Sequence, residues 1–525
     1  MRPGVWRPPV EPSPAEQAVI KAVRRAKLFV FLRQHRHELF DEEFQAELAR
    51  AYVDSPKGQP PVPPAQLALA TIVQAYAGVS DDEVIEAAVM DRRWQLVLDC
   101  MDAGQPPFSK GTLVGFRARL IERNLDRALI ERTVALAART GGFGARALRA
   151  ALDSSPLWGA GRVEDTINLM GHALRKALGV IAVLQGWGQA AGTAVLAAQA
   201  GVPQLAASSL KAALDRDWDD PAARDLALAQ VLGLLDRVEA FVAGQWGDQA
   251  AASAVAVARR VRDQDVDLTG PAPTLRRGVA KDRRISVEDG QMRHGRKSRS
   301  VLFDGYKRHV LRDLDTGLVT AVGITPANKP EASVTASIAA DLDAAGLHLA
   351  ELHIDRAYLA SDLVRDRGPD LAIYCKAWRV RGTAGRYPKT DFALDFTTGQ
   401  LTCPAGVTMA FEAGTTVHFP KHTCAACPLR ARCTTSSNGR SVAIHPDEAL
   451  LAELRDYQAT PAGRARLRER VKVEHALAHI GHWQGRRARY RGTRKNLFDL
   501  RRTAVVHNLH VIARQPAAGN YQLTA

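Results

Sequence analysis

A short apolar run within residues 351–360 ends at an acid, Asp355. Leu352 and Ile354 precede Asp355, and a turn-like Ala-Gly-Leu segment leads into the run. This pattern predicts a buried strand that ends at Asp355. A buried acid is costly unless something pairs with it, and ligands of open α/β sheets bind at this end of the strands. Asp355 is therefore either part of a functional site or the cap of the next helix.

The composition is that of a folded protein of 525 residues, long enough for two to four domains. A net charge of +15 suits a polyanion such as nucleic acid, although solubility alone explains part of it. Six cysteines, four of them clustered, indicate a reducing compartment. No signal peptide is expected at the N-terminus. The uncharged stretch between Lys176 and Lys211 is rich in Ala, Gly and Gln, which favours a buried helical pair over a membrane span.

The N-terminal third has a helical pattern. Residues 15–56 are expected to be helical, a second helix begins at Pro64, and Ser80 and Glu83 form a capping box for a third. Ser109 can cap a further helix, whose basic residues are Lys110, Arg117, Arg119 and Arg123. Short helices and a basic last helix fit a helix-turn-helix-like DNA reader. A helical bundle with a solvated basic face fits the pattern equally well.

A second apolar run, residues 147–156, ends at Asp153 before turn residues and repeats the pattern around Asp355. Residues 167–265 form an Ala- and Leu-rich helical block. After it come two strands joined as a hairpin within residues 300–325, then helices alternating with strands. This order predicts a mixed α/β sheet interrupted by a helical insertion, and it resembles the RNase H-like arrangement.

Four cysteines follow the sheet segments with the spacing Cys403-x20-Cys424-x2-Cys427-x5-Cys433. Four thiolates that leave no position for solvent make a closed structural zinc site. The spacing therefore predicts bound zinc, and the alternative is a small loop domain with reduced thiols. Cys100 and Cys375 are expected to be ordinary core residues.

The C-terminal segment, residues 461–514, is helical and strongly basic. Glu474 lies on one helical stripe with Leu467, Val471 and Ala478, and a carboxylate among apolar neighbours requires a cation or a metal. Glu469 lies on a similar stripe, so periodicity does not choose between the two.

Two strand-end aspartates and one helical glutamate in a basic chain suggest a specific chemistry. Carboxylate oxygens are hard ligands that hold Mg²⁺ or Mn²⁺. Two such ions, about 4 Å apart, stabilise the attacking and leaving oxygens of an in-line phosphoryl displacement. The basic helices would hold the phosphate backbone and make binding salt-dependent.

The chain resembles the bacterial insertion-sequence transposases of the DDE class with an InsH-type N-terminal domain. The resemblance extends from about Val62 to His510. Its motifs, in chain order, are Ala77-Gly-Val-Ser-Asp81, Phe108-Ser-Lys-Gly-Thr-Leu113, Ala151-Leu-Asp153-Ser-Ser-Pro156, Asp304-Gly-Tyr306-Lys307-Arg-His309, Asp355-Arg-Ala-Tyr358, Arg470-x3-Glu474 and Gly485-Arg486-Arg487-Ala-Arg489. Each motif alone is a weak signal, but their order makes a strong one.

The resemblance implies that Asp153, Asp355 and Glu474 are a catalytic triad that binds two Mg²⁺ or Mn²⁺ ions. It favours Glu474 over Glu469, because only Glu474 follows an Arg by four positions. It also implies a set of DNA-binding residues: Lys110, Arg117, Lys307, Arg470, Arg486, Arg487 and Arg489. Two positions depart from the family pattern. Leu467 stands where related transposases have Tyr, and Gly481 stands where they have Lys.

The expected fold is an RNase H-like α/β domain with an all-α, helix-turn-helix-like N-terminal domain. The expected domains are residues 1–145 for DNA binding and 146–515 for catalysis, with a helical insertion at about 160–270 and a Cys-rich insertion at about 400–435. The expected function is transposition: the protein binds terminal inverted repeats, cleaves the DNA and joins it to target DNA, as a homodimer or larger assembly. It is expected in the bacterial cytoplasm at the nucleoid, without a membrane. The alternatives are an RNase H-like nuclease and an inactive DNA-binding regulator derived from a transposase.

Overall fold

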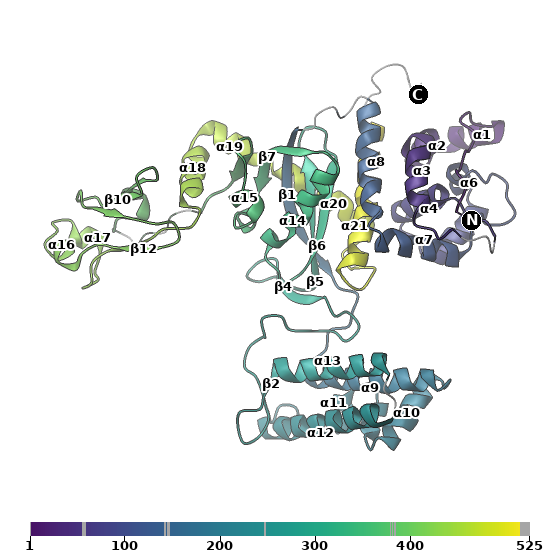
Figure 1. Ribbon diagram of the computed structural model, residues 1–525, viewed down its shortest axis with the longest axis horizontal. Coiled ribbons are helices and arrows are strands. Elements are labelled where there is room, and N and C mark those ends of the chain that lie inside the picture. Colours follow the sequence, from purple (N-terminus) through teal and green to yellow (C-terminus); the bar gives the residue numbers. More distant parts are fainter. Residues whose placement is uncertain are drawn as a thin grey trace.

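The computed structural model describes residues 2–54, 59–140, 143, 147–245, 248–378, 380, 382 and 385–514. Figure 1 shows a central sheet with the N-terminal helices on one side, a helical lobe below and a small Cys-containing lobe on the far side. The boundary expected between residues 145 and 146 lies outside the described residues.

The N-terminal part is helical, as the sequence predicted. Its helices are α1 (Pro14–Ala22), α2 (Lys27–Leu39), α3 (Glu42–Ala49), α4 (Pro64–Ala77), α5 (Asp81–Met90), α6 (Arg92–Leu98), α7 (Lys110–Glu122) and α8 (Asp126–Arg139). Ser80 and Glu83 form the expected capping box of α5, and the Ser109 side chain caps α7. Gly78 ends α4 in a left-handed conformation that favours glycine.

Six strands form a mixed sheet. They are β1 (Ala147–Trp158), β4 (Arg293–Arg296), β5 (Leu302–Asp313), β6 (Val319–Pro326), β7 (His348–Ile354) and β8 (Ala372–Cys375). The order is β4-β5-β1-β7-β8, and β6 pairs with β5 beyond the end of β4. β5 is antiparallel to β1, β4 and β6, whereas β1, β7 and β8 are parallel. The protein is therefore a mixed α/β protein, as predicted.

The segments after β6 and β7 return the chain to the sheet. They are the 3₁₀ turn η2 (Glu331–Val334) and α14 (Thr335–Ala344) after β6, and η3 (Arg356–Tyr358) and α15 (Asp362–Arg365) after β7. The predicted α/β alternation is present, and the hairpin predicted within residues 300–325 is formed by β5 and β6.

β1 continues beyond Asp153, so the prediction of a strand end at this residue is wrong. The residues that suggested a turn, Ser154 to Pro156, instead continue the antiparallel ladder with β5 up to Trp158. The parallel ladder with β7 does stop here, because its last pair is Leu152 with Ile354. Asp153 thus lies at the end of one ladder and inside the other.

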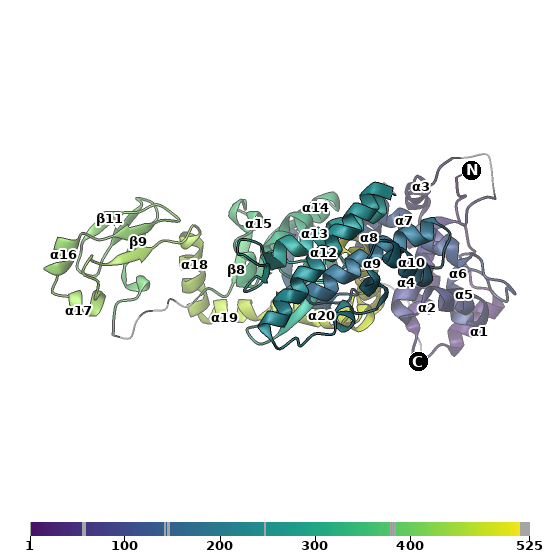
Figure 2. The same cartoon turned by 90° about the horizontal axis from the view of Figure 1, so that it is seen from below.

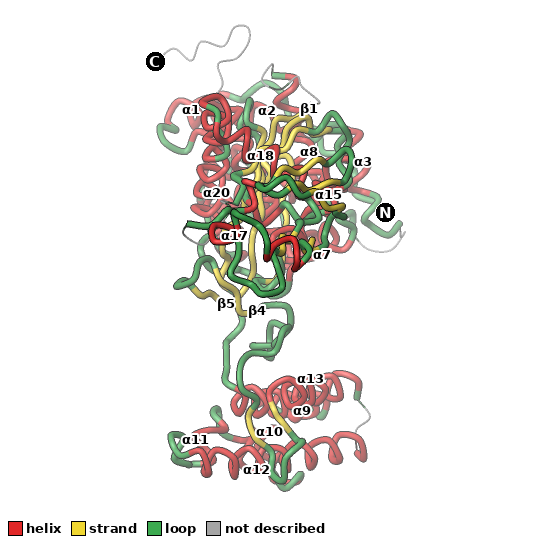
Figure 3. The backbone as a smooth tube through the Cα atoms, turned by 90° about the vertical axis from the view of Figure 1, so that its left-hand side faces the viewer, coloured by secondary structure: helices red, strands yellow, loops and turns green. Residues whose placement is uncertain are grey.

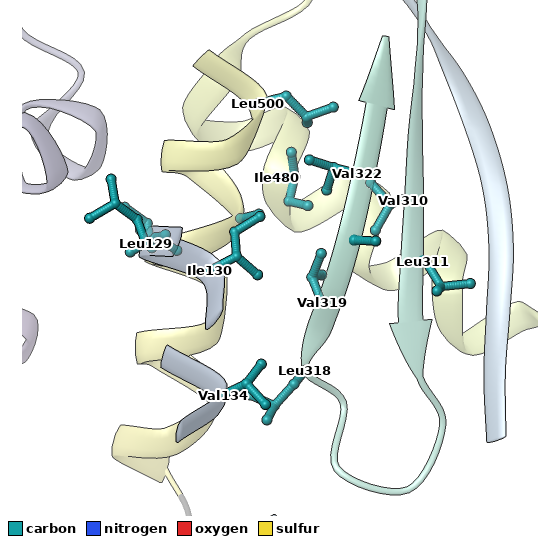
Figure 4. Packing of buried hydrophobic residues seen from close by; sticks show 14 of the residues in the cluster. Leu129, Ile130, Val134, Val310, Leu311, Leu318, Val319, Val322, Ile480 and Leu500 are labelled. Atoms are coloured by element: carbon teal, nitrogen blue, oxygen red, sulfur yellow. The ribbon is translucent and has the colours of Figure 1, made fainter. Parts of the chain in front are cut away.

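Four helices form the C-terminal part of the described chain. They are α18 (Glu448–Ala459), α19 (Pro461–Arg468), α20 (Val471–Gln484) and α21 (Thr493–Arg514). α21 packs against α4, α8 and β6. Figure 4 shows residues of α8, β5, β6, α20 and α21 meeting in this core, among them Ile130, Val310, Val319, Ile480 and Leu500. One continuous hydrophobic core thus joins the N-terminal helices to the sheet.

The helical insertion forms a separate lobe. It comprises α9 (Thr166–Leu184), α10 (Gln189–Gln199), the turn η1 (Pro203–Ala206), α11 (Leu210–Leu214), α12 (Pro221–Gln245) and α13 (Gln249–Asp265), followed by the short strands β2 (Val266–Asp267) and β3 (Thr274–Leu275). It has its own hydrophobic core, and Figure 3 shows it joined to the sheet by extended segments. Among the described helices, α9 is long and apolar enough to span a membrane, but it is a mostly buried core helix of this lobe.

The Cys-containing lobe is small and made of short elements. They are η4 (Lys389–Asp391), β9 (Ala393–Asp395), β10 (Gln400–Thr402), β11 (Thr408–Ala410), β12 (Thr416–His418), α16 (Lys421–Ala425), α17 (Arg430–Cys433) and β13 (Ser441–Ala443). Figure 2 shows it at the end of the molecule opposite the N-terminal helices, next to α18. Its core contains Phe392, Leu401 and Phe419, with Cys403, Cys424 and Cys433 packed against it.

Candidate active site

Two acids lie at the same edge of the sheet because of the register of two neighbouring strands. β1 and β7 are parallel, and their last pair is Leu152 with Ile354. Asp153 and Asp355 are the residues that follow these two. Asp355 also caps η3 by accepting a hydrogen bond from the N–H of Arg356 (2.7 Å). The capping role and a role in a site are therefore compatible.

The third acid, Glu474, lies in the first turn of α20. Val473, Ala476, Leu477 and Ile480 are the buried side of this helix, which packs against β1 and β5. The Glu474 side chain remains 53% exposed, so it reaches solvent beside the sheet edge. The apolar face of α20 thus positions the carboxylate.

All three acids line one open cleft of about 670 Å³. Its cationic lining residues are Arg296, Lys297, Lys307, Arg308, Arg470 and Arg486. Glu469, the alternative to Glu474, does not line the cleft and forms ion pairs with Arg149 and Arg466. The structure therefore gives the two glutamates different surroundings that periodicity did not distinguish.

Arg470 contacts two of the three acids. Its guanidinium donates to Asp153 Oδ2 (2.5 Å) and to Glu474 Oε1 (3.4 Å). Burial raises the pKa of Asp153, and the guanidinium of Arg470 and the N–H of Ser154 only partly oppose this. Burial alone would lower the pKa of Arg470, but the charge of Asp153, with smaller contributions from Asp355 and Glu474, raises it above its ordinary value. Arg470 is therefore the counter-charge of this acid group.

Arg308 is a positioning residue that the sequence analysis did not single out. Its guanidinium donates to Ser155 Oγ on β1 (2.7 Å), and to Gln484 Oε1 and the Gly485 carbonyl at the end of α20 (both 3.0 Å). Burial lowers its pKa to about 10. These bonds fix α20, which carries Glu474, against the strand that carries Asp153. Its position in the Lys307-Arg-His309 motif was the signal available.

The buried side chains of His309 and Tyr358 hold the segment after Asp355 against the sheet. His309 Nδ1 and the Tyr358 hydroxyl are 2.8 Å apart, and His309 Nε2 and Thr325 Oγ1 are 2.9 Å apart. Burial and the charge of Lys307 lower the pKa of His309 to about 3, and burial raises the pKa of Tyr358 well above its usual value. Both groups are therefore neutral near pH 7. Tyr358 lines the cleft, whereas His309 joins it to β5 and β6.

Some of the cations predicted to bind DNA line the cleft, and others lie outside it. Lys307, Arg470 and Arg486 line the cleft, and Lys307 is paired with Glu331. Arg487 and Arg489 are exposed. Within the described residues their side chains donate only to backbone carbonyls, Arg487 to those of Gly159 and Ala160 and Arg489 to those of Val79 and Gly78. These positions keep both in the proposed DNA-binding set.

Two predicted DNA contacts lie on α7, away from the cleft residues. Lys110 is exposed and paired with Asp82. Arg117 is only 7% exposed, and it is paired with Asp81 and hydrogen bonded to Gln74. A guanidinium held inside the protein by these partners is not available to phosphates. Arg117 is therefore removed from the proposed DNA-binding set, because its charge holds α4, α5 and α7 together.

The four clustered cysteines line one small cavity of about 30 Å³, together with Tyr387, Arg430 and Arg440. All four thiols are free. Burial raises the pKa of Cys433, and the Cys424, Cys403 and Cys427 thiols add to this, whereas Arg440 opposes it. Among the residues that the structure describes, no three Cys, His, Asp or Glu side chains are arranged to hold a metal ion. Zinc binding by Cys403, Cys424, Cys427 and Cys433 stays a prediction.

Two family models match the chain. The model described as a transposase DDE domain matches residues 402–513, which include Glu474, and the model described as a transposase domain (DUF772) matches residues 23–119. No curated protein and no solved structure matches. The first match ends within α21, and the second covers α2 to most of α7. The two matches, which together cover less than half of the chain, support an insertion-sequence DDE transposase.

Proposed function

We propose that the protein transposes DNA: it binds the terminal inverted repeats of an insertion sequence, cleaves the DNA strand and joins it to a target. The observation that carries this proposal is the cleft that Asp153, Asp355 and Glu474 share with six cations. Acids alone would repel a phosphate backbone, and cations alone would bind it without chemistry. Both groups in one cleft suit phosphodiester chemistry at a bound strand.

The sheet supports an RNase H-like catalytic core. β6 and β1 each pair with β5 in antiparallel fashion. On its other side β1 pairs in parallel with β7, which in turn pairs in parallel with β8. Asp153 and Asp355 follow the paired residues of β1 and β7, at the end of the parallel strands where ligands of α/β sheets bind. We extend the proposal to the domain organisation: a helix-turn-helix-like DNA-binding part in residues 1–145 and a catalytic part in residues 146–515 with two insertions.

Divalent metal ions are the cofactors that DDE transposases generally use. The donor set suits them, because three carboxylates supply hard oxygen ligands in one solvent-filled cleft. Asp153, Asp355 and Glu474 would hold two Mg²⁺ or Mn²⁺ ions. When bound, such ions provide Lewis-acid stabilisation of the attacking and leaving oxygens. Among the described residues no three ligand side chains are arranged as a metal site, and Arg470 is hydrogen bonded to Asp153 and Glu474.

The chain's own residues bind and orient the DNA in this proposal. Arg470 balances the charge of Asp153 and Glu474, which limits their mutual repulsion. Lys307, Arg486, Arg487 and Arg489 hold phosphates, and Lys110 on α7 contacts the repeat. Pairing of two DNA ends requires at least two protein copies. The DNA substrate implies a location at the bacterial nucleoid in the cytoplasm.

The test compares wild type with Glu474→Gln and Glu469→Gln. Glu469→Gln is a matched control, because it makes the same chemical change five residues earlier and outside the cleft. Each protein is incubated with a labelled duplex of the flanking inverted repeat, a target plasmid and Mg²⁺ or Mn²⁺. We expect wild type and Glu469→Gln to nick at the repeat boundary and join the target. Glu474→Gln should bind the repeat and do neither.

Three outcomes would replace the proposal. Equal cleavage by Glu474→Gln would contradict the role of this glutamate. Cleavage without joining would indicate the RNase H-like nuclease. Binding with no cleavage by any protein, unchanged when EDTA removes divalent ions, would indicate the DNA-binding regulator.

A further inference from the structure

A basic hairpin, to which the proposed function gives no separate role, reaches the cleft that contains the three acids. It comprises β4, the turn at residues 297–301 and the first residues of β5, up to Gly305. Arg296 and Lys297, at the end of β4 and the start of the turn, line the same cleft as the three acids. We call residues 293–305 the basic hairpin.

The basic hairpin is fixed to the sheet. β4 pairs with β5 from Arg293 opposite Gly305 to Arg296 opposite Leu302, and the Lys297 N–H donates to the Val301 carbonyl (2.9 Å). Gly305 has φ of +151°, and a Cβ there would lie 2.3 Å from the Leu157 carbonyl oxygen. The backbone at the base of the hairpin therefore packs tightly against β1, with no room for a side chain at this position. Its cations therefore occupy a set position beside the acids.

The cations at the tip are free. Arg296, Lys297 and Arg299 are exposed, and within the described residues their side chains form no ion pair and no hydrogen bond. Their neighbours differ, because Arg293 is paired with Asp282 and Lys307 with Glu331. Unpaired cations near one another repel, so their concentration at one tip favours an anionic partner.

Two aromatic residues lie beside Arg486, another cation of the same cleft. The Arg486 guanidinium lies over the Trp158 ring, 5.2 Å from its centre, and the Trp158 and Phe303 rings are 5.9 Å apart. Phe303 belongs to the basic hairpin and, like Arg486, lines the cleft. Cations interleaved with aromatic rings are typical of surfaces that hold a nucleic-acid strand, because the cations bind phosphates and the rings pack against bases.

We propose that the basic hairpin is a clamp for the DNA strand that reacts. Arg296 and Lys297 bind phosphates next to the one seated at the acids, and Trp158 with Arg486 packs against the adjacent nucleotide. One strand presents a phosphate about every 3.4 Å along the helix axis, so a strand that enters this cleft brings several phosphates with it. The clamp rests on the proposed function and adds the residues that position the strand.

The first test measures DNA binding without catalysis. The double variant Arg296→Ala/Lys297→Ala is compared with Arg224→Ala/Arg237→Ala. This control removes the same charge from exposed positions on α12 that have no ion pair within the described part of the chain. Affinity for the inverted-repeat duplex is measured by fluorescence anisotropy in EDTA at several salt concentrations. Loss of two phosphate contacts should reduce the slope of log affinity against log salt by about 1.8. The control slope should equal that of wild type.

The second test locates the lost contacts. Ethylation of single phosphates near the repeat boundary should weaken binding by wild type and should no longer matter to Arg296→Ala/Lys297→Ala, while more distant positions still interfere. An unchanged slope, an equal slope change in the control, or an unchanged interference pattern would each overturn the clamp. If wild type binds the repeat but never cleaves it, the proposed function fails, and the slopes still decide whether the hairpin holds DNA.

Discussion

The helical lobe is nearly neutral, whereas the last three C-terminal helices and the residues that link them are strongly basic. Residues 166–265 contain nine Lys or Arg and ten Asp or Glu, whereas residues 461–514 contain fourteen and three. The chain as a whole has a net charge of +15, so most of its excess is in the C-terminal helices. Residues 461–514 include Glu474, Arg470 and Arg486 of the cleft. The lobe contributes no residue to it.

Within the C-terminal helices, charge serves two purposes. Arg494 and Arg501 are paired with Asp126 at the start of α8, and Arg502 with Asp499, all in buried or half-buried positions. These cations join α21 to its surroundings and are not free for DNA. Arg486, by contrast, has no anionic partner among the described residues and faces the cleft. A net charge therefore overstates how many cations are available to a phosphate backbone.

The largest expected effect tests whether the helical lobe can be destabilised without destabilising the sheet. Leu174 is fully buried in the lobe's own core. Leu174→Ala should lower the stability of the lobe by about 2–5 kcal/mol, because it removes buried methyl groups and leaves a cavity. Hydrogen exchange followed by mass spectrometry should show faster exchange in peptides of α9, α12 and α13 and no change in peptides of β1 and β5.

The matched change Leu500→Ala places the cavity in the core that α21 shares with the sheet. It should speed exchange in β6, α8 and α21 and leave the lobe unaffected. Faster exchange throughout the chain in both variants would contradict two separate cores and make the lobe part of one cooperative unit.

A smaller effect should separate structural from DNA-binding cations. Arg117→Gln breaks a buried ion pair with Asp81 and should lower stability by about 3 kcal/mol, with no change in the salt dependence of DNA binding. Arg486→Gln should leave stability within about 0.5 kcal/mol and reduce the salt slope by about 0.9. Denaturant unfolding and anisotropy titrations measure the two quantities. A reduced slope in folded Arg117→Gln would return Arg117 to the DNA-binding set.

The local signals in the sequence were reliable where one residue acts on its neighbours. Ser80 and Ser109 cap the predicted helices, and Asp355 follows its predicted strand, because each depends on a few adjacent residues. Turn-forming residues after Asp153 misled the prediction, because pairing with β5, more than 150 residues away in the chain, overrides local preference.

The sequence predicted least well which cations are exposed and which are paired with acids inside the protein. Arg117 and Lys110 are seven residues apart on one helix, yet one is buried and the other is exposed. No motif predicted from the sequence contains Arg296 or Lys297, and β4 has four residues with no strand pattern. Which cation finds an acid depends on long-range packing, which a single sequence does not encode in any local motif. The assignment of the acid triad to catalysis stays a prediction.

The smallest expected effect is a pH dependence of the stability that the ion pair between Asp81 on α5 and Arg117 on α7 contributes. Hydrogen bonds from Arg117 hold the pKa of Asp81 at about 2, against partial burial, with help from Gln74. In the unfolded chain this pKa is about 3.9. The lower folded value means that ionised Asp81 stabilises the fold above about pH 4, and that this contribution disappears as the pH falls from about 4 to about 2. Because Asp81 is partly exposed, solvent screening limits it to about 1 kcal/mol.

Thermal melts of wild type, Asp81→Asn and Asp82→Asn between pH 6 and pH 2 test this contribution. Other paired carboxylates also lose their charge in this range, so the difference between wild type and variant is the informative quantity. Asp81→Asn should be less stable than wild type at pH 6, and the difference should shrink towards pH 2. Asp82→Asn is the control, because the ion pair of Asp82 with Lys110 is exposed and contributes little at any pH. A constant difference across the range would mean that Asp81 acts through packing and not through its charge.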